Sequence, residues 1–364
     1  MTLFATPPRL LWLSTDAEAI TRQLAGQALD ASSAGLLRDD ISTDEISPLP
    51  AMVHFDARLG RYPYTGLTTA DGRLPIGVDA IRTAGVQVVV AGRRYGKGSS
   101  REHAVVAERS AIVRLVIAAS FERIYRQNAD NADNADSAGL LTSTDLSLAD
   151  RLARGEPVEL DELLADRDPL AAQIVRAGGL LKFGRRTFAA LAPAPLPESP
   201  RPMTLFDKIV ARQALASLTL PAPRVPGDGG FVAADLRFIH EYYTAMAAHL
   251  LDPEYGPALA LKDKPGIVCV EDHLSYVHRS PVHVAQGLVT DVLGLSRGHR
   301  AFVARHGLVD HGCLQAIEAG DPGNTGSPPG ATSPPSRPSA PRSFNPPAAP
   351  APTAAPAPRP IQPR

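Results

Sequence analysis

The sequence predicts an α/β fold, and two observations support that prediction. Short apolar runs rich in β-branched residues alternate with segments of helical periodicity through the first half of the chain. Two such runs, Val86–Ala91 and Leu115–Ala118, flank a helix-compatible segment that begins near Glu102. A strand, a helix and a second strand in that order favour a parallel pair of strands joined by a right-handed crossover.

The other elements of the first segment follow from the same patterns. Short apolar runs predict strands at 9–13 and 180–183, and apolar periodicity predicts helices at 16–27, 146–152 and 161–176. Ser14 or Thr15 is expected to cap the first of these helices. Pro169 should break or kink the last one, and Gly178-Gly179 should end it.

Composition divides the rest of the chain. Residues 191–202 are dense in proline and alanine, which is typical of a linker between a first domain, 1–190, and a second globular segment, 203–314. Within that second segment we expect helices at 205–218 and 236–251 and a strand at 267–270. Residues 315–364 are mostly Pro, Ala, Ser, Gly and Arg and are expected to form a disordered tail.

Charge and cysteine content exclude several classes of protein. The 364 residues carry a net charge of −1, which argues against a nucleic acid as partner. Cys269 and Cys313 are too few for a disulfide scaffold, and Met1–Arg9 lacks the pattern of a signal peptide. No apolar run approaches the ~20 residues that cross a bilayer. These features predict a soluble cytoplasmic protein without a membrane partner.

The run Tyr95–His103 is the most informative local motif, because it places two hydroxyls and a guanidinium where a glycine-rich turn opens a helix. A helix N-terminus attracts carboxylate or phosphate, and Arg101 adds a bidentate fork for the same anions. Gly96 and Gly98 let the backbone approach a ligand closely. The alternative is a capped turn whose serines, Ser99 and Ser100, only satisfy backbone donors. The spacing alone leaves both interpretations open.

Four stretches stand in one order along the first segment: 39–48, 95–103, 118–125 and 138–141. Together they resemble the swivel (small) domain of the aconitase and isopropylmalate isomerase family. The resemblance implies an aconitase-type swivel domain, a three-layer α/β fold, over 1–190. Three shorter stretches resemble the beginning of the family's large catalytic subunit: 203–209, 234–240 and 270–274. Residues 203–314 are therefore expected to be a partial α/β catalytic domain.

The resemblance implies a hydro-lyase that moves a hydroxyl between neighbouring carbons of an isopropylmalate-like 2-hydroxy di- or tricarboxylic acid, by dehydration and rehydration. Ser99 would be the catalytic base, acting as an alkoxide that the helix N-terminus and Arg101 stabilise. Arg101 would also hold a carboxylate of the substrate, and Ser100 would donate a hydrogen bond to the same region. A small carboxylic acid is thus the expected substrate.

Asp272 and His273 resemble the family's pair in which a carboxylate orients an imidazole that protonates the departing hydroxyl; the alternative is a turn with a capping aspartate. His240 stands where isopropylmalate isomerases carry a histidine and aconitases a substrate-binding glutamine. Asp44 resembles an aspartate near the base serine, or else caps a turn. Where aconitases carry a further substrate-binding arginine this chain has Asp56, so a third, citrate-type carboxylate is not the expected ligand.

The family uses a [4Fe–4S] cluster held by three cysteine thiolates, two of them in a Cys-x-x-Cys pair. Neither Cys269 nor Cys313 belongs to such a pair, and the family's Asp-Ser-His-Thr motif is also missing. We therefore expect no metal ligands in this chain and an incomplete enzyme. A reading-frame shift near 311–320 would explain both the loss and the composition of the tail. The Asn-Ala-Asp repeat at 128–136 is interpreted as a tolerated duplication.

Two other functions remain open from the sequence. One is a non-catalytic or inactive swivel subunit that docks a separate, cluster-bearing large subunit. The other is RNA binding, which the balanced charge disfavours.

Overall fold

The computed structural model describes residues 2–98, 102–132, 139–196, 202–274 and 292–313, together with 282 and 285–286. Residues Met1–Glu318 form one compact unit. The predicted base and carboxylate clamp, Ser99, Ser100 and Arg101, lie outside the described residues, and so does the tail predicted to be disordered, 315–364.

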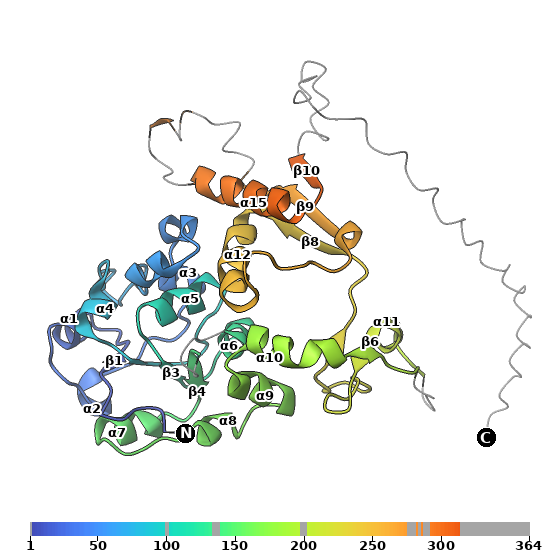
Figure 1. Cartoon of the computed structure of the whole chain (residues 1–364). Helices are drawn as coiled ribbons and strands as arrows, with labels where there is room; N and C mark the ends of the chain where they lie inside the picture. Colours follow the sequence, from blue (N-terminus) through green and yellow to red (C-terminus); the bar gives the residue numbers. More distant parts are fainter. Residues whose placement is uncertain are drawn as a thin grey trace, which may run out of the picture. The chain divides into compact units, whose positions relative to one another are not determined.

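A parallel sheet of four strands forms the centre of the first segment (Figure 1). Its strands follow the order β1 (Leu10–Trp12), β2 (Val88–Ala91), β3 (Leu115–Ala118) and β4 (Leu141–Ser143). Helix α5 (His103–Ser110) connects β2 to β3, which pair in parallel with Val89 opposite Val116. The predicted β-α-β unit is therefore confirmed.

Helices cover both faces of this sheet. Alternate side chains along each strand point to opposite faces and so enter two different hydrophobic cores. Val89 and Val116 pack with α1 (Ala17–Leu24), α4 (Ala80–Ala84), α5 and α6 (Arg123–Asn131). Val88 and Leu115 pack with α2 (Ala31–Ala34), α7 (Ser147–Ala153), α8 (Leu160–Leu164) and α9 (Pro169–Ala177). Strands that are buried on both faces read as continuous apolar runs, as these do. The predicted three-layer α/β arrangement is confirmed.

Details of the helix ends correct one prediction and confirm another. The cap of α1 is Asp16, whose side chain accepts a hydrogen bond from the Glu18 amide at 2.9 Å, so the prediction of Ser14 or Thr15 is wrong. Pro169 begins α9 after α8 has ended, as the predicted break requires.

The predicted strand at 180–183 is wrong, because Leu180–Thr187 forms helix α10. Its apolar residues fit a helical face as well as a strand, and Phe183 is buried against the ring of Phe231. Gly178, in the left-handed conformation (φ 87°), ends α9 as predicted. A short apolar run alone does not separate the two structures.

A second parallel sheet, in the order β10-β9-β8, organises the later part of the chain. Its strands are β8 (Arg237–His240), β9 (Ile267–Glu271) and β10 (Asp310–Cys313), and its helices are α12 (Glu241–Tyr255) and α15 (Val292–His306). The predicted helix 236–251 is wrong over its first turn, because Arg237–His240 pairs with β9. The strand predicted at 267–270 is confirmed as part of β9.

Smaller elements complete the described chain. They are α3 (Thr43–Ile46), η1 (Leu49–Val53), η2 (Ala57–Arg61), η3 (Phe188–Ala190), η4 (Lys264–Gly266) and α11 (Leu205–Gln213), with an antiparallel sheet of β5 (Ala192–Pro193), β6 (Ala214–Ala216) and β7 (Phe231–Val232). The helix predicted at 205–218 ends early, at Gln213, because the next residues pair with β5 and β7. Among the described helices, none is long and apolar enough to span a membrane.

Candidate functional site

Backbone hydrogen bonds hold the start of the glycine turn between β2 and α5, before the residues that the structure does not describe. The amides of Gly96 and Lys97 donate to the Ile41 carbonyl at 2.9 and 3.0 Å, and the Lys97 carbonyl accepts from the Thr43 amide at 2.8 Å. Gly96 has a φ of 78° and Gly98 one of 109°, which explains both glycines. Residues 96 and 97 of the turn are therefore held to the segment at 41–43.

Asp44 lies beside this turn, since its neighbour Ser42 forms a β-bridge with Lys97. Ser42, not Asp44, caps helix α3, in a reciprocal capping box with Glu45. Glu45 also forms an ion pair with Arg38 at 2.5 Å. Ser42 therefore provides the N-cap of this helix, and the role of Asp44, as a turn residue or toward a ligand, stays a prediction.

A buried carboxyl group supports the turn from below. Glu108 on α5 accepts hydrogen bonds from the hydroxyls of Tyr64 (2.5 Å), Tyr95 and Tyr125 (2.5 Å). Burial raises the pKa of Glu108 to about 7, although the three hydroxyls oppose that shift. Tyr95 begins the turn, so this cluster ties the turn to α5 and α6.

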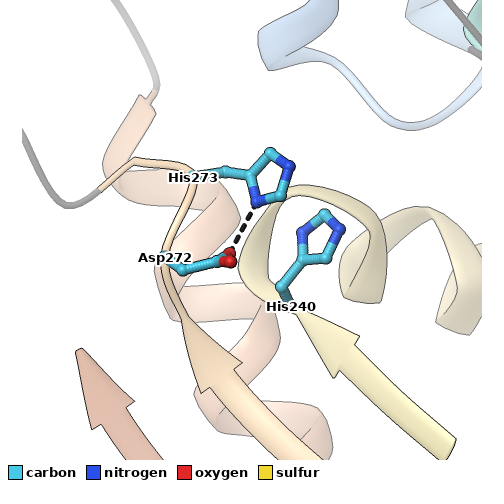
Figure 2. Close-up of side chains that lie close together, drawn as sticks. All are labelled: His240, Asp272 and His273. Atoms are coloured by element: carbon cyan, nitrogen blue, oxygen red, sulfur yellow. Dashed lines mark hydrogen bonds and ion pairs between the residues drawn. The ribbon is translucent and has the colours of Figure 1, made fainter. Parts of the chain in front are cut away.

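The later predicted residues meet at the carboxyl ends of β8 and β9, where His240 and Asp272 follow neighbouring parallel strands. The Asp272 carboxylate lies 2.6 Å from Nδ1 of His273, as in the predicted pair. The rings of His240 and His273 stack with centroids 3.8 Å apart and planes 6° from parallel. Figure 2 shows a nitrogen of each ring on the side of the Asp272 carboxylate.

Glu241, the first residue of α12, shapes this group although no motif pointed to it. Its buried carboxylate accepts hydrogen bonds from the amides of Asp272 (3.0 Å) and Leu274. The Asp-His turn is thereby anchored through its backbone, while the side chain of His273 is 50% exposed and that of Asp272 is 36% exposed. Direct adjacency to His240 was the one sequence signal for Glu241.

Burial favours the neutral form of the His240 imidazole. Desolvation lowers its pKa, and the neighbouring His273 lowers it further, while the carboxylates of Asp272 and Glu241 act in the opposite direction. Its Nδ1 is buried and has no hydrogen-bond partner among the described residues. A neutral imidazole with an unused nitrogen is suited to receive a ligand.

Aromatic contacts connect the start of helix α5 with the group around His240. Tyr242 packs against His103, at the start of α5, with ring centroids 5.3 Å apart, and against His273 at 6.1 Å. Its hydroxyl lies 2.8 Å from the sulfur of Met52. His103 is two residues beyond Arg101, so the end of the glycine turn and the His240 group share one neighbour. Sequence patterns gave no signal for Tyr242.

The described cysteine environment does not fit an iron–sulfur cluster. The chain holds two cysteines where the cluster needs three thiolates. Cys269 is fully buried in β9, and burial raises the pKa of its thiol, which disfavours the thiolate that a metal requires. Two cysteines, one of them a buried thiol, therefore cannot by themselves supply the three thiolates of a cluster.

A polar cavity of about 620 Å³ lies apart from these residues, between α6, α9 and the loop at 228–230. Its wall includes Asp130, the first aspartate of the Asn-Ala-Asp repeat, which forms a nearly buried ion pair with Arg167 at 3.0 Å. The first copy of the repeat thus has a structural role, and 133–136 lie outside the described residues.

Comparison with known proteins gives consistent matches. The Aconitase C-terminal domain family matches residues 74–134. The 3-isopropylmalate dehydratase small subunit 2 of Methanopyrus kandleri is 36% identical over 163 residues, covering 41% of this chain and 88% of that protein. The small subunit from Pyrobaculum aerophilum is 33% identical over 160 residues, covering 40% and 90%.

Two further matches complete the comparison. Aconitase AMT8 of Alternaria alternata is 33% identical over 214 residues, which cover 51% of this chain and 24% of that protein. The crystal structure of 3-isopropylmalate dehydratase from Methanocaldococcus jannaschii is 27% identical, covers 42% of this chain and 90% of that one, and has a TM-score of 0.30.

Proposed function

Because this chain belongs to the aconitase family, among relatives named 3-isopropylmalate dehydratase small subunits, we propose that it supplies the swivel domain of a hydro-lyase. The substrate is an isopropylmalate-like 2-hydroxy acid with two or three carboxylates. The observation that supports this most is the coverage of those relatives, 88–90% of their own length, together with a family match that includes the whole glycine turn.

In this proposal the turn removes the proton from carbon. Ser99, as an alkoxide, accepts the proton, and the pair of electrons from the C–H bond begins the double bond. Arg101 and Ser100 hold a carboxylate next to that carbon, where the guanidinium offsets the negative charge that develops. Asp44 lies at the edge of the same turn and contacts the substrate side.

The second half of the reaction removes the hydroxyl. His273 gives a proton to the departing oxygen, the C–O bond breaks and water leaves, while Asp272 orients the imidazole through its Nδ1 contact of 2.6 Å. His240 contacts the substrate beside this pair. Rehydration with the opposite regiochemistry uses the same groups in reverse and completes the isomerisation.

A complete enzyme requires a second chain in this proposal. Dehydration in this family depends on a cluster that polarises the leaving hydroxyl, and the cysteines here do not fit one. Since the relatives are named small subunits, the partner is a separate large catalytic subunit that carries the cluster.

The proposal is tested by mixing this chain with a cluster-bearing large subunit of 3-isopropylmalate dehydratase and following the unsaturated product by ultraviolet absorbance. Ser99→Ala should lower the turnover of the mixture about 10²–10⁴-fold, the usual contribution of a catalytic base. Ser110→Ala, at the far end of α5, serves as the matched control and should leave turnover unchanged. Unchanged turnover in Ser99→Ala contradicts the assignment of the base.

The missing cluster ligands also favour a second candidate, a swivel subunit that docks a large subunit without contributing to catalysis. It predicts a stable complex whose turnover is insensitive to Ser99→Ala and Arg101→Ala. Gel filtration of the mixture, combined with the assay above, separates the two candidates.

A further inference from the structure

Three potential metal ligands meet at the ends of β8 and β9. One ligand atom each from His240, Asp272 and His273 lies within 4.8 Å of the other two. His240 ends β8, and Asp272 and His273 lie in the turn that follows the neighbouring parallel strand β9. Two imidazoles and one carboxylate form a donor set that divalent transition metals prefer, with further positions open to water.

An unused nitrogen points to a ligand at this place. His240 is 8% exposed, and its Nδ1 has no hydrogen-bond partner among the described residues. A buried polar atom without a partner costs free energy, which coordination of a cation would recover. In Figure 2 a nitrogen of His240 lies on the side of the Asp272 carboxylate rather than turned away from it.

The local charge also favours a cation. The carboxylates of Asp272 and Glu241 lie next to the two imidazoles, and Glu241 is fully buried. Glu241 binds the backbone of the Asp-His turn, so it holds two of the three ligands in place without occupying a coordination position. Such supporting groups raise metal affinity by fixing the ligands in advance.

From these observations we propose that His240, Asp272 and His273 bind one Zn²⁺ ion. The stacked rings must first separate, because lone pairs lie in the ring planes and two parallel planes do not share one ion position. The side chain of His273 is 50% exposed and His240 is buried, so His273 is the ring that would have to turn. A neutral imidazole carries its proton on one nitrogen only, so the other nitrogen of His273 would serve as the ligand once the ring has turned.

The test of this inference does not depend on the proposed reaction, because Zn²⁺ binding is measured on this chain alone. It concerns a single ion on nitrogen and oxygen ligands, not an iron–sulfur cluster on thiolates. Zinc ligation and proton donation are alternative states of His273, since the same side chain serves both.

The test uses the full chain after treatment with a chelator. Calorimetric titration with Zn²⁺ should show one bound ion, and Co²⁺ should give visible absorption bands of four- or five-coordinate cobalt. His240→Ala, Asp272→Asn and His273→Ala should each weaken Zn²⁺ binding about tenfold or more, and Glu241→Gln, which loses a supporting carboxylate, should weaken it about tenfold. His249→Ala, an exposed histidine on the same helix α12, should bind Zn²⁺ like the wild type.

Two results would overturn the proposal: no stoichiometric Zn²⁺ binding to the wild-type chain, or binding that His273→Ala leaves unchanged. His273 is half exposed, so its variant is expected to stay folded, and a thermal unfolding curve checks this. Loss of binding in His249→Ala as well would identify adventitious surface coordination and contradict the assigned ligands.

Discussion

Gly96 illustrates how a single backbone position supports the candidate site. Its φ of 78° lies in the left-handed region, and a Cβ at this position would overlap the ring of Tyr125. Tyr125 in turn donates its hydroxyl to Glu108 beneath the turn. The absence of a side chain at Gly96 thus lets the start of the turn rest directly on the buried tyrosine cluster.

We expect Gly96→Ala to destabilise the protein by more than a left-handed alanine costs elsewhere. The conformational cost of about 1–2 kcal/mol is joined by about 1–3 kcal/mol for the overlap with Tyr125. Gly72→Ala is the control, because Gly72 has a φ of 80° but nothing within 4 Å of its added Cβ. Urea unfolding of both variants measures the difference, and equal losses would contradict the packing argument.

The sequence identifies single residues that belong to motifs, but it does not identify the residues that contact them from distant parts of the chain. His240, Asp272 and His273 were predicted as site residues, and the structure brings these three together. The supporting contacts of Glu241 and Glu108 were not predicted, since each depends on residues far along the chain. Glu241 needs the Asp-His turn, and Glu108 needs tyrosines from two connecting segments and from α6. Ser99, Ser100 and Arg101 stay predictions.

Among the elements, those with an unambiguous pattern were predicted well. The strand at Leu115–Ala118 and the break at Pro169 agree with the structure, because a doubly buried strand and a proline give strong local signals. Leu180–Phe183 and Arg237–His240 were assigned to the wrong type. Short apolar runs fit helix and strand alike, and pairing with β9 decided the second case.

The Glu108 cluster links α5 to its neighbouring elements and predicts a dependence of stability on pH. The folded-state pKa of Glu108 is raised to about 7 from the ordinary 4.5. A raised pKa means that the contribution to stability is fully present below the unfolded value and is lost as pH rises through about 7. The free energy of unfolding of the wild type should therefore fall by about 3 kcal/mol relative to that of Glu108→Gln between pH 4.5 and 8.

Denaturant unfolding at a series of pH values measures this difference directly. The control is Glu18→Gln, which changes an exposed glutamate in the first turn of α1. Its free energy of unfolding should change with pH as that of the wild type does. If Glu108→Gln also runs parallel to wild type across this range, the carboxyl group is not the titrating element.

For the whole molecule, the central observation is a swivel-type three-layer domain followed by a second parallel sheet, at whose edge His240, Asp272 and His273 lie close together. Tyr242 contacts both His103 and His273, so one side chain links the start of α5 to the turn that follows β9. The division into 1–190, 191–202 and 203–314 stays a prediction, since residues up to Glu318 form one compact unit.

The chain's two cysteines do not provide a cluster site, although its relatives are dehydratase subunits and an aconitase. The proposed function accounts for both facts, because in it a separate large subunit would bring the cluster to the swivel turn. The proposed Zn²⁺ site concerns the chain by itself and does not replace that partner.

The most direct test titrates this chain into a fixed amount of a cluster-bearing 3-isopropylmalate dehydratase large subunit and records the dehydration of isopropylmalate. We predict that turnover appears on mixing and saturates when the two chains are equimolar, whereas either chain alone is inactive. A mixture that forms a complex by gel filtration but is no faster than the large subunit alone would contradict a catalytic role for this chain.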